Sequence, residues 1–126
     1  MESEPKKKVL LIGLSADNVD YEKWPQLTKE SLEAAFEEVI AGLTAEGYDS
    51  EWCLTDQGAT AEQKVTEALK RYVPDIVMVG AGVRTDPDLL HLFEKVINLI
   101  HEHAPDAKMA FNSLPFDTVD AVKRWS

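Results

Sequence analysis

The sequence has little cysteine and no long hydrophobic run. Its 126 residues include one cysteine, Cys53, and three histidines. A single cysteine forms no internal disulfide, which fits a reducing compartment, so we expect a cytoplasmic protein. The apolar run at residues 9–12 is too short for a signal peptide or a membrane span. We therefore expect no secretion and no membrane partner.

Positive charge is also scarce. The chain has 13 lysines and arginines against 23 acidic residues, a formal net charge of −10 at pH 7. Nucleic-acid-binding proteins usually carry a basic face that neutralises phosphates. The basic clusters here are short, flank predicted elements and do not alternate with aromatic residues; they lie at residues 6–8, 70–71 and 123–124. We expect no nucleic-acid partner, and the acidic surface favours solubility.

Four apolar segments are typical of strands. They lie at residues 7–12, 49–54, 75–79 and 107–111. The first is continuously apolar and is closed by Gly13, as expected of a parallel strand buried on both faces. The second alternates in character, which favours a position at the edge of the sheet.

Between and after these strands, apolar residues recur at spacings of three and four, which predicts four helices. Thr28 is the expected N-cap of the first, and Gly47 its expected stop. Residues 60–63 fit a capping box at the start of the second, which Pro74 ends. Residues 86–87, an aspartate and a proline, are typical of the start of the third. A short helix follows the last strand.

Strands and helices thus alternate along one domain, which we assign to residues 1–126. Such alternation implies a parallel sheet covered on both faces by helices. Right-handed crossovers favour the strand order 2-1-3-4, which reverses between the first and third strands. The predicted fold is therefore an α/β, three-layer, doubly wound sandwich with a four-stranded parallel sheet in this order.

In such sheets, ligands bind at the carboxyl ends of the strands, where the strand order reverses. Residues 75–87 indicate this place most clearly, because a buried strand there meets a turn with two glycines and then a helix start. The expected ligand-binding residues follow the first, third and fourth strands; they are Ser15, Asp17, Gly80, Gly82, Arg84, Asn112 and Ser113.

The connection at residues 14–27 is unusually long for the link between a strand and a helix. It either folds over the crevice as a lid or forms an ordered cover whose Trp24 packs on the rim of the sheet. Both alternatives place this segment beside the expected site.

The turn with two glycines has two interpretations. Gly80 and Gly82 would let a ligand approach backbone N–H groups, and Arg84 could hold a carboxylate or phosphate. Asp86 and Asp88 oppose an anion there. They already satisfy the N–H donors and the dipole at the start of the next helix, and their negative charges would repel the anion. The alternative is a tight turn in which Arg84 pairs with a nearby acid.

The second half of the chain carries several short sequence blocks on which a resemblance to known proteins rests. They are GAGVR at residues 80–84, LFE at 92–94, HAP at 103–105, FN at 111–112 and RW at 124–125. The chain resembles the flavodoxin-like and receiver-like group of doubly wound domains. On these blocks it is most similar to a family of short bacterial proteins with no assigned activity. The resemblance implies a flavodoxin-like fold and a bacterial, cytoplasmic setting.

The chain lacks the functional residues that the better-known members of this group carry after their strands. A phosphorylatable receiver needs paired acids after the first strand and an aspartate after the third, but residues 13–15 are Gly-Leu-Ser and residue 80 is glycine. A flavodoxin binds the FMN phosphate in a loop rich in hydroxyl groups and glycine. Residues 13–16 of this chain contain few of either. We expect neither phosphotransfer nor FMN, and the sequence identifies no cofactor.

Catalytic and metal-binding patterns are weak. His91, His101 and His103 do not share one helix face at the spacing that metal ligands need, so we predict no metal site. Nucleophilic catalysis needs a hydroxyl or thiol beside a base. Ser15 and Ser113 lie at the expected rim, but only His91 could approach it. Whether the chain is an enzyme stays open.

Three functions are compatible with these patterns. The favoured one is a small-molecule-binding domain for a polar or anionic ligand. The second is a protein-interaction or pseudo-receiver module that uses the face of Tyr72 or the sheet edge near Trp52. The third is a small enzyme that depends on Arg84, Ser15 or Asn112. A sheet with an open edge strand also allows a homodimer.

Overall fold

The computed structural model describes residues 6–113 and 115–126. Its centre is a four-stranded sheet in the order β2-β1-β3-β4, and each neighbouring pair is parallel. The strands are β1 (Lys8–Leu14), β2 (Asp49–Thr55), β3 (Ile76–Val79) and β4 (Lys108–Phe111). The predicted strand order is confirmed, and β2 lies at an edge as expected.

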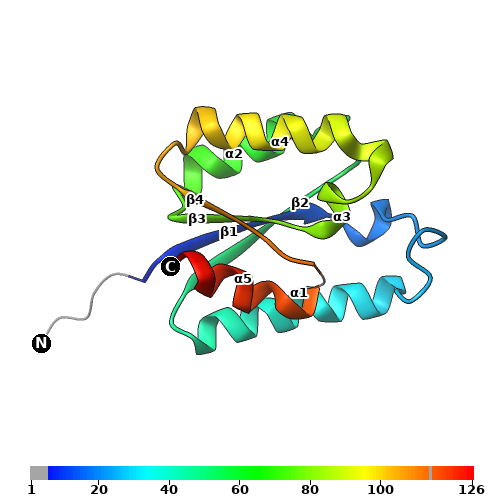
Figure 1. Cartoon of the computed structure of the whole chain (residues 1–126), viewed down its shortest axis with the longest axis horizontal. Coiled ribbons are helices and arrows are strands. Elements are labelled where there is room, and N and C mark those ends of the chain that lie inside the picture. The colour runs from blue at the N-terminus through cyan, green and yellow to red at the C-terminus, as the bar shows by residue number, and fades with distance from the viewer. Residues whose placement is uncertain (1–5, 114) are drawn as a thin grey trace, which may run out of the picture.

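Helices cover both faces of this sheet, so the predicted three-layer arrangement is also confirmed (Figure 1). One layer contains α1 (Lys29–Ala45) and α5 (Thr118–Trp125), and the other contains α2 (Ala61–Tyr72) and α4 (Leu90–His103). A helical turn, α3 (Ala81–Arg84), follows β3 directly. The described residues also form three 3-10 turns: η1 (Ala16–Asn18), η2 (Pro87–Leu89) and η3 (Pro115–Asp117).

Strand β1 forms the centre of the core. Its residues 9–12 have no exposed surface. Leu10 and Ile12 pack with α2 and α4 on one face, whereas Val9 and Leu11 pack with α1 and α5 on the other. Burial on both faces explains why this segment is apolar without alternation.

The limits of helix α1 follow the sequence prediction. Thr28 Oγ1 accepts a hydrogen bond from the Ser31 backbone N–H, with an N···O distance of 3.0 Å. Ser31 Oγ in turn accepts one from the Thr28 backbone N–H at 2.8 Å, which completes a capping box. Gly47 follows the helix with φ +90, the left-handed conformation that glycine adopts most easily.

The capping box predicted at residues 60–63 is wrong. The Thr60 hydroxyl does not cap helix α2 and lies 2.9 Å from Asp56 Oδ2. Asp56 also accepts hydrogen bonds from the backbone N–H groups of Gly58 and Thr60. Because a carboxylate is the stronger acceptor, Asp56 organises this turn and leaves the threonine as a donor.

Two segments differ from their predicted form near the carboxyl edge of the sheet. Gly13 does not end β1, because Gly13 and Leu14 still pair with β2. A Cβ at Gly13 would lie 3.4 Å from the Trp52 ring, so this ring packs closely over the strand. After β3, the predicted tight turn is the helical turn α3. Asp86 is an N-cap with Pro87 at the first position, as predicted, but the element that they begin is the 3-10 turn η2, which leads into α4.

No helix in the described part of the chain has both the length and the apolar character needed to cross a membrane.

Asp56→Asn tests the role of the Asp56 carboxylate. The hydrogen bond from the Gly58 N–H is the largest of the effects that lower the pKa of Asp56 from its ordinary value of 3.8. A lowered folded-state pKa stabilises the fold above the unfolded-state value and loses this effect as the pH falls through the folded value. We expect the variant to unfold at lower urea concentration than the wild type at pH 7, and the difference to shrink toward pH 2. An equal difference at both pH values would contradict this role.

Candidate functional site

A cavity of about 80 Å³ lies at the carboxyl edge of the sheet, above β1 and β3. This is the point where the strand order reverses, the expected ligand position in a doubly wound fold. Its floor is backbone from the ends of β1 and β3 and the start of α3: Gly13, Leu14, Gly80, Ala81 and Gly82. Its walls are mainly apolar: Val19, Trp24, Leu27, Leu32, Phe36 and Trp52. Asn112 and Ser113 add polar groups at one side.

One wall is an aromatic pair between helix α1 and strand β2. The ring centroids of Phe36 and Trp52 lie 4.7 Å apart, with the planes tilted by 50°. The Trp52 indole N–H donates a hydrogen bond to the Phe36 carbonyl oxygen at 3.0 Å. These two contacts hold the Trp52 ring in place, so this wall exists before any ligand arrives.

The two aromatic residues named for the predicted interaction surfaces are largely covered. Trp52 is half-buried and lies in the cavity wall. Tyr72 has only 9% of its surface exposed and packs in the core. The interaction module itself stays a prediction.

Residues 15–27, called here the covering loop, run from β1 to α1 across the mouth of the cavity. The loop is held by its own contacts, because the Tyr21 hydroxyl donates to the Ala16 carbonyl oxygen at 2.6 Å. Val19, Trp24 and Leu27 line the cavity. The loop thus forms an ordered cover, and Trp24 lies in the cavity wall.

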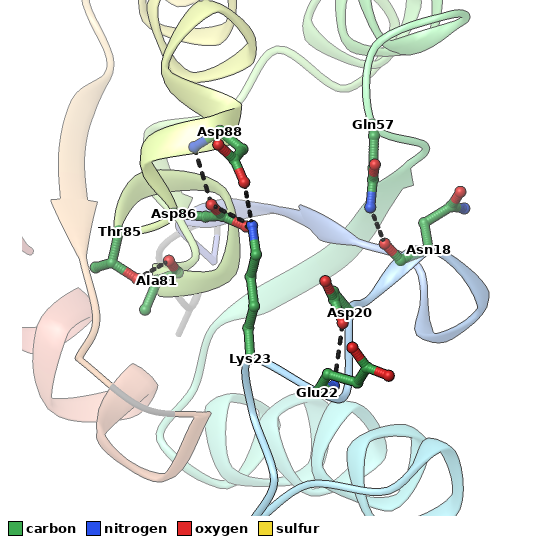
Figure 2. Close-up of polar contacts among 9 residues, drawn as sticks. All are labelled: Asn18, Asp20, Glu22, Lys23, Gln57, Ala81, Thr85, Asp86 and Asp88. Atoms are coloured by element: carbon green, nitrogen blue, oxygen red, sulfur yellow. Dashed lines mark hydrogen bonds and ion pairs between the residues drawn. The ribbon is translucent and has the colours of Figure 1, made fainter.

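Side chains on both sides hold the covering loop in place (Figure 2). Lys23 Nζ lies 3.0 Å from Oδ1 of Asp86, the N-cap of η2, and also pairs with Asp88 within η2. On the other side, Gln57 Nε2 donates to the Asn18 carbonyl oxygen at 2.7 Å. The hydrogen bonds to Asp88 and Asp86 raise the pKa of Lys23, and the bond from Lys23 lowers the pKa of Asp86. One positive charge thus pairs with two negative charges, so the cluster keeps a net charge of −1.

The structure brings four of the seven predicted site residues to the cavity. Gly80, Gly82, Asn112 and Ser113 are among its lining residues. A Cβ built at Gly82 would meet no atom within 4 Å, so there is room for a larger side chain at this point.

The other three predicted residues lie outside the lining. The Ser15 hydroxyl accepts a hydrogen bond from Asn18 Nδ2 at 2.6 Å, inside the covering loop. The Asp17 carboxylate lies 2.7 Å from Lys29 Nζ, at the start of α1. Arg84 donates to the Asn112 carbonyl oxygen at 2.6 Å, and its guanidinium carbon lies 5.8 Å from the centroid of the Phe111 ring. Arg84 thus contacts a backbone carbonyl group and an aromatic ring. The sequence suggested an anionic ligand or a nearby acid as its partner.

Asn112 connects three elements around the cavity. Its Oδ1 accepts a hydrogen bond from the Ala81 N–H at 2.8 Å, at the start of α3. Its Nδ2 donates to the Thr118 hydroxyl of α5 at 2.9 Å. With only 5% of its surface exposed, Asn112 joins the end of β4 to both helices through both ends of its amide.

The described residues contain no group of three or more histidine, cysteine or acidic side chains placed to hold a metal ion. His91 is not in the cavity lining; its side chain is 98% exposed, and its Nδ1 lies 3.8 Å from Glu94 Oε1. Cys53 is buried, and desolvation raises the pKa of its thiol, which makes it a poor nucleophile. The side chains that line the cavity are suited to binding.

Two features of the site escaped the sequence analysis. The aromatic wall joins Phe36 and Trp52, which belong to different elements and carry the ordinary pattern of core residues. Lys23 stands 63 residues from Asp86, and no local motif links them. Only the predicted adjacency of the strand ends could have suggested that these groups meet.

Fold and site together define a doubly wound α/β domain with an apolar cavity at its switch point. No protein-family model, curated protein or solved structure matches the chain. The resemblance to short bacterial proteins therefore stays a prediction, and the function is argued from the cavity.

Lys23→Met tests whether the ion pairs with Asp86 and Asp88 hold the covering loop. We expect faster amide hydrogen exchange in residues 18–24, with little change in the urea midpoint, because exposed ion pairs contribute little to global stability. Lys95→Met removes the same charge from an exposed pair with Glu62 between α4 and α2, and serves as the control. Equal exchange in the loop of both variants would show that Lys23 does not restrain it.

Asn112→Ala tests the connection among β4, α3 and α5. We expect a loss of about 1–3 kcal/mol in the free energy of unfolding, because the Ala81 N–H would lose its partner and a buried polar group left unpaired costs about that much. Asn98→Ala, at an exposed position of α4, should change it by less than about 0.5 kcal/mol. Equal losses in the two variants, measured by urea denaturation, would contradict this role of Asn112.

Proposed function

We propose that this chain is a small-molecule-binding domain whose ligand occupies the cavity between β1, β3 and the covering loop. The observation that carries the proposal is the position of this cavity at the point of strand-order reversal, under an ordered loop. Ligand sites are usually concave, mostly apolar and largely preformed, with a few polar groups that orient the ligand. The Phe36–Trp52 wall supplies the preformed apolar surface, and Asn112 and Ser113 supply polar groups.

Binding explains the lining residues better than catalysis does. A nucleophilic or acid–base mechanism needs a reactive group within hydrogen-bond reach of a partner that activates it. Among the described lining residues, Ser113 is the one hydroxyl, and no histidine or acid lines the cavity beside it. The Ser113 backbone N–H donates to Asp117, so that carboxylate already serves a backbone group.

The covering loop provides a route to the cavity. Lys23 pairs with Asp86 and Asp88, and the side chains of Lys23 and Asp88 are exposed, so solvent competes for the lysine and for the contact with Asp88. Such contacts can open locally without unfolding the sheet, whose core does not depend on them. We expect a ligand to enter by displacing the loop and to be retained when the ion pairs form again.

The contacts favour a less polar ligand than the sequence suggested. Arg84 is engaged by the Asn112 carbonyl oxygen, and the Ala81 N–H at the start of α3 is engaged by the Asn112 side chain. The Ala81 N–H is therefore not available to an anion. Arg84 Nε has no hydrogen-bond partner, but Arg84 lies outside the cavity lining. The proposal keeps the predicted site and changes the expected character of the ligand.

A fragment screen by ¹⁵N–¹H NMR tests the proposal. We expect at least one uncharged fragment to shift the amide signals of Gly13, Gly80 and Gly82 together. A ligand at 100 times its dissociation constant should also stabilise the fold by about 2.7 kcal/mol. Fragments that shift only signals remote from the cavity, or none at all, would overturn the proposal.

Gly82→Leu provides the matched variant. The added side chain starts in the cavity wall where a Cβ meets no neighbouring atom, so it can fill the space while the backbone stays in place. We expect it to abolish binding of the same fragments. Asn98→Leu adds the same side chain at an exposed position of α4, outside the cavity lining, and should bind them unchanged. Retained binding in Gly82→Leu would place the ligand elsewhere.

A further inference from the structure

The geometry points to one class of ligand: a small uncharged molecule with a single ring or a branched apolar group and one hydrogen-bonding group. This inference rests on the proposed function and adds charge, size and shape to it. Each of these properties follows from a different feature of the cavity.

The charge follows from the lining. The described residues that line the cavity are apolar, aromatic, glycine or neutral polar, and none of these is charged. Of the charged groups near these residues in the chain, Lys23 pairs with Asp86 and Asp88, and Asp17 pairs with Lys29. Arg84 has a buried Nε without a partner, but it lies outside the lining and donates to the Asn112 carbonyl oxygen. An ion placed here would lose water without gaining a counter-charge, which is strongly unfavourable. A neutral ligand loses far less.

The size follows from the enclosed volume. At about 80 Å³, the cavity has roughly half the ~150 Å³ of an engineered cavity that binds benzene. A nucleotide therefore exceeds the enclosed space. A single ring enters when the covering loop shifts slightly, or when one edge of the ring stays at the open side.

The shape follows from the walls and floor. Trp24, Phe36 and Trp52 offer aromatic surface, against which a flat ring or a branched chain packs well. The floor includes glycine residues at positions 13, 80 and 82, so a ligand can approach the backbone at the strand ends. At Gly80, even a Cβ would lie 3.4 Å from the Ile12 carbonyl oxygen, which shows how closely the two strand ends approach here.

The polar requirement follows from Asn112 and Ser113. The side-chain amide of Asn112 is hydrogen-bonded at both Oδ1 and Nδ2. Oδ1 has a second lone pair, and Nδ2 has a second hydrogen. Ser113 is exposed and carries a hydroxyl that can donate or accept. These groups suit one hydroxyl or carbonyl group of a ligand.

Three matched probes test the ligand class at pH 7: benzyl alcohol, benzoate and benzylamine. They share one ring and differ in charge, being neutral, negative and positive. We expect NMR titration of the wild-type protein to show a dissociation constant for benzyl alcohol at least tenfold lower than for either ion, equivalent to about 1.4 kcal/mol. The shifted signals should include Gly80 and Gly82.

Leu27→Lys tests the charge argument in the opposite direction. Leu27 lines the cavity from the covering loop and is only half-buried, so a lysine can be accommodated there. We expect this variant to bind benzoate at least tenfold more tightly than the wild type does. Leu27→Met keeps the lining neutral and should retain the wild-type preference for benzyl alcohol.

The outcomes separate the ligand class from the proposed function. If benzoate or benzylamine binds the wild-type cavity as tightly as benzyl alcohol, the ligand class is overturned while a small-molecule site remains. If no probe binds but the fragment screen finds another cavity ligand, the ligand class is likewise overturned and the small-molecule site remains. If the cavity signals respond to neither the probes nor the fragments, both proposals are overturned.

Discussion

The burial of β1 on both faces is the constraint on which the rest of the structure depends. A strand with no exposed residue from Val9 to Ile12 needs helices above and below it. The chain meets this need by placing α1 on one side of the sheet and α2 on the other. The strand order then reverses beside β1, and the loops that leave β1 and β3 separate above it. The cavity is a consequence of this topology.

The residues around the strand ends explain why this crevice stays partly empty. Gly13, Gly80 and Gly82 have no side chains to fill it, and α3 turns Arg84 toward the end of β4. The covering loop closes the space from above with apolar side chains, but exposed ion pairs contribute to holding it. The stable part of the site is therefore the sheet and its aromatic wall, and the less stable part is the cover.

The sequence predicted the sheet order because each step depends on local patterns. Continuous apolar runs indicated buried strands, Thr28 and Gly47 marked the limits of α1, and crossover handedness restricted the order. The missed features depend on distant contacts or on competition between neighbours. Asp56, and not Thr60, organises the turn before α2. Lys23 pairs with Asp86 and Asp88, which lie more than sixty residues away in the sequence. A two-glycine pattern also does not distinguish a tight turn from the helical turn α3.

The candidate site shows a more general difficulty of prediction from sequence. Polar residues after parallel strands were selected because ligands bind there, yet Ser15, Asp17, Arg84 and Asn112 all bond to other parts of the protein. Strand ends leave backbone groups without partners in the sheet, and Asn112 and Arg84 satisfy two of them. Ser15 and Asp17 bond to other side chains. The surface left for a ligand comes instead from residues such as Phe36 and Trp52, whose pattern is that of the core. In this fold, a ligand would therefore be recognised mainly by apolar shape, and the polar residues at the strand ends would hold that shape in place.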